Sequence, residues 1–307
     1  MFESKYRDQV DLLIDALPYI DKEKCFALKG GTAINLFVRD LPRLSVDIDL
    51  TYVPFDGRKE ALLNISEALL RIKNDIETTI SGITVNEVSQ SDGTIAKLTI
   101  QKDRAQIKIE VNTMLRGHLY ETEALNLSQK VQDTFEKYAE ITIVSQAELF
   151  GGKICAALDR QHPRDLFDVY YLLENEGLTD DIKYGFISAL LSHGRPVHEV
   201  IAPNFKNQQE TFETQFQGMT NTEFGYDEFE KTRTRLVDEI HASLTKNDKE
   251  FLISFVKGQP KWDLFPHKRL KDLPAIQWKL LNIGKLIKND PKKNRSYIDL
   301  LKDKINH

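Results

Sequence analysis

Apolar and polar residues alternate with a period of two in several short segments of the first half of the chain, as is typical of β-strands. In residues 46–53 the alternation places Ile48 and Leu50 on one side of the segment and Asp47 and Asp49 on the other. Further strands are expected at residues 94–100 and 106–113, joined as a hairpin, at the short apolar run 25–28, and at residues 141–144. We therefore expect a sheet in which one strand carries two carboxylates on the same side.

Apolar residues spaced three and four apart predict helices over much of the chain. Thr32 is expected to cap a short helix after the Gly30-Gly31 turn. Longer helices are expected at residues 6–17, 58–80, 145–160, 163–173, 182–191, 229–244, 248–256, 276–287 and 297–305.

The expected strands lie in the first half of the chain, and the second half is expected to be helical. This order predicts an α+β fold with two domains, a mixed domain at residues 1–193 and a mainly helical one at 194–307. Residues 194–226, which are richer in Asn, Gln, Pro and Gly, are expected to be a linker or an irregular segment.

The net charge of −5 over 307 residues hides an uneven distribution. Residues 251–307 hold 13 Lys and Arg against five Asp, a net charge of +8, so the rest of the chain carries −13. A polyanion partner near the C-terminus and a solvated helical surface both fit this asymmetry. Two tryptophans in this part, Trp262 and Trp278, are expected either to pack or to stack on a base.

Several classes of protein are excluded. The two cysteines, Cys25 and Cys155, are far apart and form no C-x-x-C pair, which argues against a thiol-bound zinc site or a disulfide framework. No apolar run approaches the roughly 20 residues of a membrane span, and residues 1–10 lack a secretory signal, so a cytoplasmic protein without a membrane partner is expected. The seven histidines form no H-x-x-x-H or triad-like pairing.

The candidate chemistry begins at Gly30-Gly31-Thr32, a strand-to-helix turn of the kind that lets a phosphate approach the backbone. Asp47 and Asp49 then supply two oxygen ligands for divalent cations. Glu110, on the polar side of a later strand, is a candidate third carboxylate, although by itself this position is more typical of a cross-strand charge pair.

A second group lies in residues 153–168. Lys153 and Arg160 share a helix face because they are seven residues apart, and Asp165 and Asp168 share a face of the next helix. One interpretation is a cationic clamp in which Lys153 reaches a triphosphate and Asp165 orients it. The other is structural: Asp165 caps its helix, and Arg160 or Arg164 pairs with Asp168.

Three segments carry a family resemblance. FALKGGTAINLFVRDLPRLSVDIDL, with Arg43-x-Ser45 leading into the acids, QIKIEVN with Lys108 and Glu110, and AELFGGKICAALDRQHPRDLFDVYYLL resemble motifs of the AbiEii/AbiGii nucleotidyltransferases. These proteins are toxins of type IV toxin–antitoxin systems and include the mycobacterial MenT toxins. Thr32 stands where the wider superfamily more often has Ser, and it keeps the hydroxyl.

The resemblance implies a polymerase-β-like core, a mixed sheet with flanking helices, followed by a helical C-terminal region. It implies transfer of a nucleotide from an NTP to an acceptor, foremost the tRNA 3′ end, with Mg²⁺ or Mn²⁺. It also implies a cognate antitoxin partner and a role in phage defence. The catalytic residues would be Asp47, Asp49, Lys153 and Asp165; the metal ligands Asp47, Asp49 and Glu110; and the nucleotide-binding residues Gly31, Thr32, Ser45, Lys108, Lys153, Arg160 and Asp168.

An RNA acceptor would meet basic residues of the C-terminal region, for which the candidates are Lys257, Lys261, Lys268, Arg269, Lys271, Lys292, Lys293 and Arg295. Three alternatives remain. The enzyme could modify a small molecule or a protein, it could be a nuclease using the same metals, or it could be a catalytically inactive relative that acts by binding.

Overall fold

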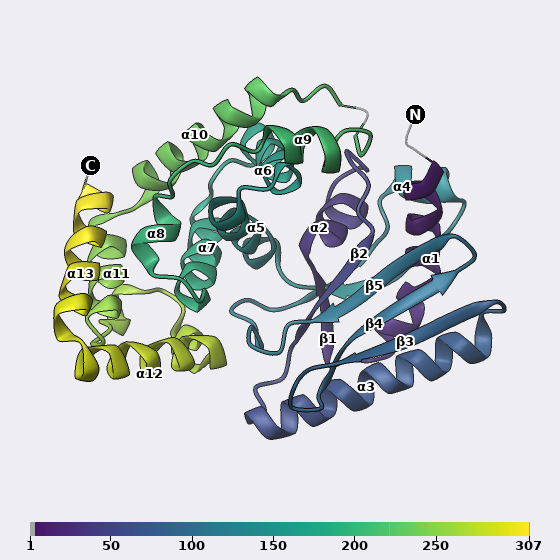
Figure 1. Ribbon diagram of the computed structural model, residues 1–307, viewed down its shortest axis with the longest axis horizontal. Helices are drawn as coiled ribbons and strands as arrows, with labels where there is room; N and C mark the ends of the chain where they lie inside the picture. The colour runs from purple at the N-terminus through teal and green to yellow at the C-terminus, as the bar shows by residue number, and fades with distance from the viewer. Residues whose placement is uncertain (1–3, 221, 307) are drawn as a thin grey trace. The chain divides into compact units, whose positions relative to one another are not determined.

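The computed structural model describes residues 4–220 and 222–306 (Figure 1). Contacts divide these residues into two compact units. Unit 1 runs to Ser145 and adds Phe216–Glu223, and unit 2 holds Gln146–Gln215 and the residues from Phe224 onward. The predicted domains, 1–193 and 194–307, have a different boundary and stay a prediction about the organisation of the chain.

Unit 1 is built on a mixed sheet whose seven described strands are ordered β3-β4-β5-β2-β1-β7-β6. The β2–β5 and β1–β7 pairs are parallel, and the other neighbouring pairs are antiparallel. The strands are β1 (Phe26–Lys29), β2 (Asp47–Tyr52), β3 (Ile83–Ser89), β4 (Ile95–Lys102), β5 (Ala105–Val111), β6 (Glu123–Asn126) and β7 (Glu140–Ile143). The expected strands and hairpin are present, whereas β3 and β6 lie outside the alternating segments recognised in the sequence.

Helices α1 (Ser4–Asp21) and α3 (Arg58–Thr79) pack on the sheet. Figure 1 shows α3 running along β3 and β4. Its apolar stripe is buried there, and the apolar side of β2, with Ile48 and Leu50, is buried as well. The acidic positions of β2 alternate with these buried residues, so they lie on the opposite face of the sheet. A short helix, α4 (Gln129–Phe135), completes unit 1.

Gly30 and Gly31 are the first two residues of α2 (Gly30–Ala33), which continues as the π-helical turn η1 (Ile34–Val38). The expectation that Thr32 caps this helix was wrong. Lys29 occupies the N-cap position, and Thr32 lies inside the helix, where its hydroxyl donates to the carbonyl oxygen of Asp47.

Unit 2 is helical among its described residues. It contains α5 (Gln146–Arg160), α6 (Pro163–Asn175), α7 (Asp180–Ser192), α8 (Val197–Ile201), α9 (Gln209–Gln215), α10 (Tyr226–Ser243), α11 (Lys246–Val256), η2 (Trp262–Leu264), η3 (Lys268–Asp272), α12 (Pro274–Asn289) and α13 (Pro291–Asn306).

Helices α5 and α7 approach each other closely because each has a glycine at the crossing. A Cβ atom on Gly151 would lie 2.3 Å from the main-chain carbon of Gly185, and one on Gly185 would lie 2.0 Å from the carbonyl oxygen of Ala147. This contact fixes α5, which carries Lys153 and Arg160, against the centre of unit 2.

The segment expected to be a linker, residues 194–226, is only partly irregular. It forms α8 and α9, and its part Phe216–Glu223 belongs to unit 1. Among the described residues no helix has the length and apolar character needed to cross a membrane.

Candidate active site

The acidic face of unit 1 is organised by strand register. Asp49 of β2 is paired with Lys29 of β1 on one side and with Glu110 of β5 on the other, and Glu110 is paired in turn with Lys97 of β4. Paired residues point to the same face of a sheet. One row across four strands therefore carries a carboxylate on each of the two central strands and a lysine on each outer one.

Asp47 lies two residues along β2 and so projects to the same face as Asp49. Its register partner on β5 is Lys108. The sheet thus brings together four residues expected at the site, two from each of two parallel strands, namely Asp47, Asp49, Lys108 and Glu110.

The glycine turn packs directly against these acids. A Cβ atom on Gly30, whose φ is +75°, would lie 2.6 Å from Oδ2 of Asp49. At Gly31 a Cβ would lie 2.6 Å from a guanidinium nitrogen of Arg43 and 3.0 Å from Oγ of Ser45. Glycine is favoured at Gly30 by the positive φ, and at both positions a Cβ would force neighbouring side chains to shift.

Thr32 ties the turn to the start of β2. Its hydroxyl donates to the carbonyl oxygen of Asp47 over 2.5 Å and lies 3.0 Å from Oγ of Ser45. Both hydroxyl residues are buried. The amide of buried Asn35 donates to the carbonyl oxygen of Gly31 (2.9 Å), a contact that the sequence did not suggest. The glycine turn and the start of β2 are therefore packed together through buried side chains, and the turn is not a flexible loop.

The segment preceding the acids is held by residues distant in sequence. The main-chain nitrogen of Leu44 donates to the carbonyl oxygen of Met219 (2.9 Å), and the hydroxyl of Thr220 donates to the carbonyl oxygen of Pro42 (2.8 Å). Buried Arg43 forms a β-bridge with Thr220. These contacts explain why Phe216–Glu223 belongs to unit 1.

Glu110 occupies the expected face, but its carboxylate forms an ion pair with Lys97 (3.1 Å), and its side chain is 57% exposed. The partner is Lys97 of β4 rather than Lys108, which stands beside Glu110 in the sequence. Register beside Asp49 favours a metal-site role, and the ion pair favours a structural one.

The donor set suits a small, hard cation. Among the described residues no three Asp, Glu, His or Cys side chains are placed to hold a metal by themselves. Asp47 and Asp49 present carboxylate oxygens from one side of β2. Mg²⁺ needs only one or two carboxylates, because it keeps waters and takes substrate phosphate oxygens into its coordination shell.

The second group of candidate residues lies in unit 2 and is an ion-pair network. Nζ of Lys153 lies 2.9 Å from Oδ1 of Asp165 and 3.0 Å from Oδ2 of Asp168, and all three side chains are at most 6% exposed. Arg160, 62% exposed, binds both oxygens of Asp165 at 2.5 and 2.9 Å. Two of the three N–H donors of Lys153 are thus used within unit 2.

Charge controls the ionisation of this network. Burial alone would raise the pKa of Asp165, but the nearby Lys153 and Arg160 outweigh it and hold that pKa well below its usual range. Asp165 is therefore a carboxylate at neutral pH.

The structural interpretation of Asp165 as a helix cap was wrong. The N-cap of α6 is His162, whose Nδ1 accepts a hydrogen bond from the main-chain nitrogen of Arg164 (3.2 Å), with Pro163 as the first helical residue. Asp165 lies two residues further in, where its side chain can reach Lys153 and Arg160.

Comparison with known proteins identifies the family of the chain and its fold. A sequence model described as "Nucleotidyl transferase AbiEii toxin, Type IV TA system" matches residues 11–282. Among solved structures, the chain is similar to MenT4, a nucleotidyltransferase toxin from Mycobacterium tuberculosis H37Rv, with a TM-score of 0.62 and 14% identity over 92% of this chain and 95% of that one. No curated protein sequence matches.

The structural similarity confirms the predicted fold, a mixed sheet with flanking helices followed by a helical C-terminal region. The family match extends over most of the chain, well beyond the three motifs, and the predicted membership is confirmed by it. The chain belongs to the AbiEii family of nucleotidyltransferase toxins of type IV toxin–antitoxin systems.

Proposed function

We propose that the protein transfers a nucleotide from an NTP to the 3′ end of tRNA by a two-metal mechanism. The observation that carries this is the face of β2 on which Asp47 and Asp49 project together beside a glycine turn packed against Asp49. Two Mg²⁺ or Mn²⁺ ions held there would supply activation of the attacking hydroxyl and neutralise the leaving pyrophosphate.

The other residues have supporting roles in this proposal. Thr32 and Ser45 hold the Gly31 turn against β2, where the triphosphate would lie. Lys153, Asp165 and Asp168 are positioning residues, since their charges are paired with one another in unit 2. Exposed Lys108, the register partner of Asp47, is the unit 1 cation that would contact the nucleotide.

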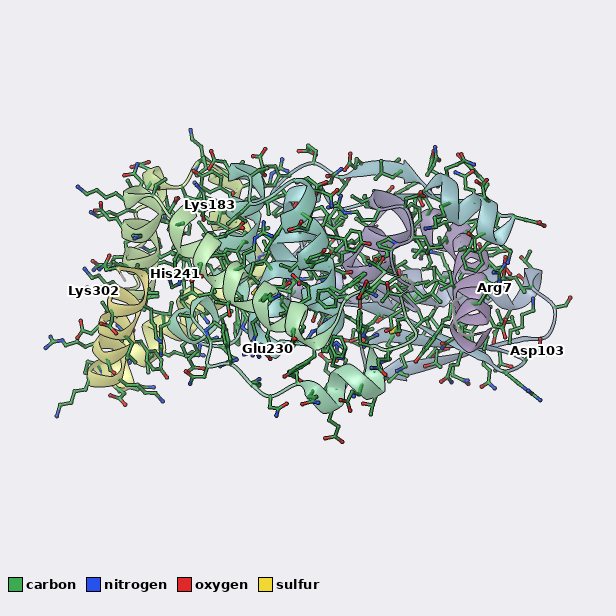
Figure 2. All side chains as sticks on the ribbon, turned by 90° about the horizontal axis from the view of Figure 1, so that it is seen from above. Arg7, Asp103, Lys183, Glu230, His241 and Lys302 are labelled. Carbon is green, nitrogen blue, oxygen red and sulfur yellow. The ribbon has the colours of Figure 1, made fainter. Side chains whose placement is uncertain are left out.

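The test is incubation of the protein with Mg²⁺, each radiolabelled NTP in turn and total tRNA. Asp49→Asn removes the metal-binding charge with little change in shape. Asp103→Asn is the matched control, because Asp103 lies at the tip of the β4–β5 hairpin (Figure 2) with a φ of +51° that Asn tolerates. We expect label on tRNA with the wild type and Asp103→Asn, and none with Asp49→Asn.

Metal dependence is tested by chelation. EDTA should abolish the transfer, and Mg²⁺ or Mn²⁺ should restore it. If label appears on a protein or a small molecule instead of RNA, that molecule, and not tRNA, is the acceptor. Transfer that is absent from every mixture would favour an inactive binding protein.

The role of Glu110 is tested with its ion-pair partner. If Glu110 contributes to the metal site, Glu110→Gln should raise the Mg²⁺ concentration for half-maximal transfer several-fold, whereas Lys97→Met should not. Equal effects of the two substitutions would make Glu110 only the partner of Lys97.

A cognate antitoxin remains part of the proposal, because the family consists of toxins of toxin–antitoxin systems. Its mode of action is testable by co-expressing the neighbouring gene product and measuring the transfer.

A further inference from the structure

Helix α12 carries a row of solvent-exposed side chains on one face. Trp278, Leu281, Lys285 and Lys288 are spaced three and four residues apart, so they lie within one side of the helix. The side chains of Trp278 and Leu281 are 49% and 60% exposed. An indole that is half in water contributes little to the core of unit 2 and is available to a ligand.

The two tryptophans of the chain differ in this respect. The ring of Trp262 lies 5.9 Å from that of Phe251 and 6.4 Å from that of Phe255, so half-buried Trp262 packs against buried aromatic side chains of unit 2. Trp278 has the ammonium of Lys285 over its ring, 5.5 Å from the centroid. Only Trp278 combines an exposed aromatic face with an adjacent cation.

The charge around Trp278 is one-sided. No Asp or Glu occurs in α12, and the only acid between residues 274 and 295 is Asp290. Asp290 accepts a hydrogen bond from the main-chain nitrogen of Lys293 at the start of α13 (2.9 Å). Among the described residues no carboxylate lies within ion-pairing distance of Lys285 or Lys288.

Lys279, the remaining lysine of α12, is not part of this surface. Its Nζ donates to the carbonyl oxygens of His193 (2.7 Å) and Arg195 (2.6 Å), so it serves to attach α12 to the chain that follows α7. The exposed set continues past the end of α12, and we call it the α12 surface: Trp278, Leu281, Lys285, Lys288, Lys292 and Arg295.

We propose that the α12 surface binds the RNA acceptor, an inference that rests on the proposed function. The indole of Trp278 would stack on an unpaired base, and the lysines would contact the flanking phosphates. A helix that lies on a lipid surface separates its apolar side from its cationic side. Here lysines and exposed apolar side chains share one face, and the opposite side, with Ile276 and Ile283, is buried.

Filter binding of labelled tRNA without NTP measures this directly. The test variant is Lys285→Gln/Lys288→Gln. The control, Lys22→Gln/Lys24→Gln, removes the same charge from unit 1, where the two lysines pair with Asp75 and Asp21. We expect the test variant to bind about tenfold more weakly and to lower the slope of log affinity against log salt by about 1.5, and the control to change neither.

Trp278 is tested separately. Trp278→Ala should weaken tRNA binding about tenfold through loss of stacking, and Trp278→Phe should weaken it less. In Trp262→Phe the only remaining tryptophan is Trp278, so tRNA should quench its fluorescence with the affinity found by filter binding.

Several outcomes overturn the inference. If the two lysine double variants weaken tRNA binding equally, the loss comes from the change in net charge and not from the α12 surface. Unchanged tRNA binding, combined with lost binding of phosphatidylserine vesicles or of polyglutamate, would make this face a lipid or an acidic-protein surface. If the wild type labels tRNA and the α12 variants keep its KM, the inference alone fails. If the wild type neither binds nor labels RNA, the proposed function fails with it.

Discussion

Oδ2 of Asp49 lies 2.6 Å from the position that a Cβ atom on Gly30 would occupy. The turn therefore packs closely against the acid strand, and a side chain at Gly30 would force the carboxylate of Asp49 to move. This relationship links a backbone requirement to the proposed metal site.

Gly30→Ala should separate the effect of the positive φ on stability from the effect of a Cβ on the position of Asp49. Gly30 and Gly82 have nearly the same positive φ, +75° and +73°, but a Cβ on Gly82 meets nothing within 4 Å. We expect each Ala substitution to lower the free energy of unfolding by about 1–2 kcal/mol. Only Gly30→Ala should also lower nucleotide transfer more than tenfold. Urea unfolding and the transfer assay provide the measurements, and equal activity of the two variants would contradict the fit.

Lys153→Met should destabilise unit 2, because it leaves Asp165 and Asp168 buried without their shared cation. We expect a loss of about 3 kcal/mol in the free energy of unfolding. Adding Asp168→Asn should recover part of that loss, with a coupling of about 1–3 kcal/mol in a double-mutant cycle. Additive effects would show that the two groups do not act as a pair.

Gly151→Ala and Gly152→Ala test the crossing of α5 and α7 with adjacent positions of one helix. A Cβ on Gly151 would overlap the backbone of Gly185, whereas nothing lies within 4 Å of one on Gly152. We expect Gly151→Ala to lower the melting temperature strongly, as overpacking costs about 1–3 kcal/mol or more. Gly152→Ala should raise stability by up to about 1 kcal/mol through helix propensity. A neutral Gly151→Ala would mean that the helices can move apart.

His162 should make stability depend on pH. Burial lowers the pKa of His162 below 6.5, and its cap requires an unprotonated Nδ1. Between the folded pKa and 6.5 the unfolded chain binds more protons, so this contribution is complete above pH 6.5 and is lost as pH falls through the folded pKa.

The control for that prediction is His162→Asn, which keeps a capping side chain but does not titrate. Urea unfolding at pH 7.5 and pH 5 should show a larger loss for the wild type than for the variant. Burial also lowers the pKa of His198 and His267, so a smaller pH dependence should persist in the variant. Identical losses would exclude His162 as the titrating cap.

Much of the fold was predictable because it depends on local periodicity. Alternation in β2 and β5 assigns Asp47, Asp49 and Glu110 to the polar sides of strands, and the structure has those strands. Helical spacing likewise placed Lys153 and Asp168 on neighbouring helices. Periodicity reports which side of an element faces the core, and that is a property of a few consecutive residues.

Only the tertiary structure decided which strands are neighbours and which charged side chains form ion pairs. Asp49 stands beside Glu110 because β2 and β5, about 60 residues apart in the chain, are parallel neighbours. Lys153 binds Asp165 and Asp168 together because α6, which begins directly after its His162 cap, packs against α5. Sequence spacing contains no such information, since burial of the whole sheet and helix set selects the partners.

The same distinction applies at the C-terminal region. Its excess of Lys and Arg is visible in the sequence. Only the folded structure shows that Lys285 and Lys288 lie on the same side of a helix as exposed Trp278, whereas Trp262 packs against Phe251. The amino-acid sequence by itself determined the residue types, their faces and the family. The tertiary structure decided which charges are neutralised inside and which remain in water, because neutralisation needs a partner within a few ångströms, and packing brings partners from different elements that close.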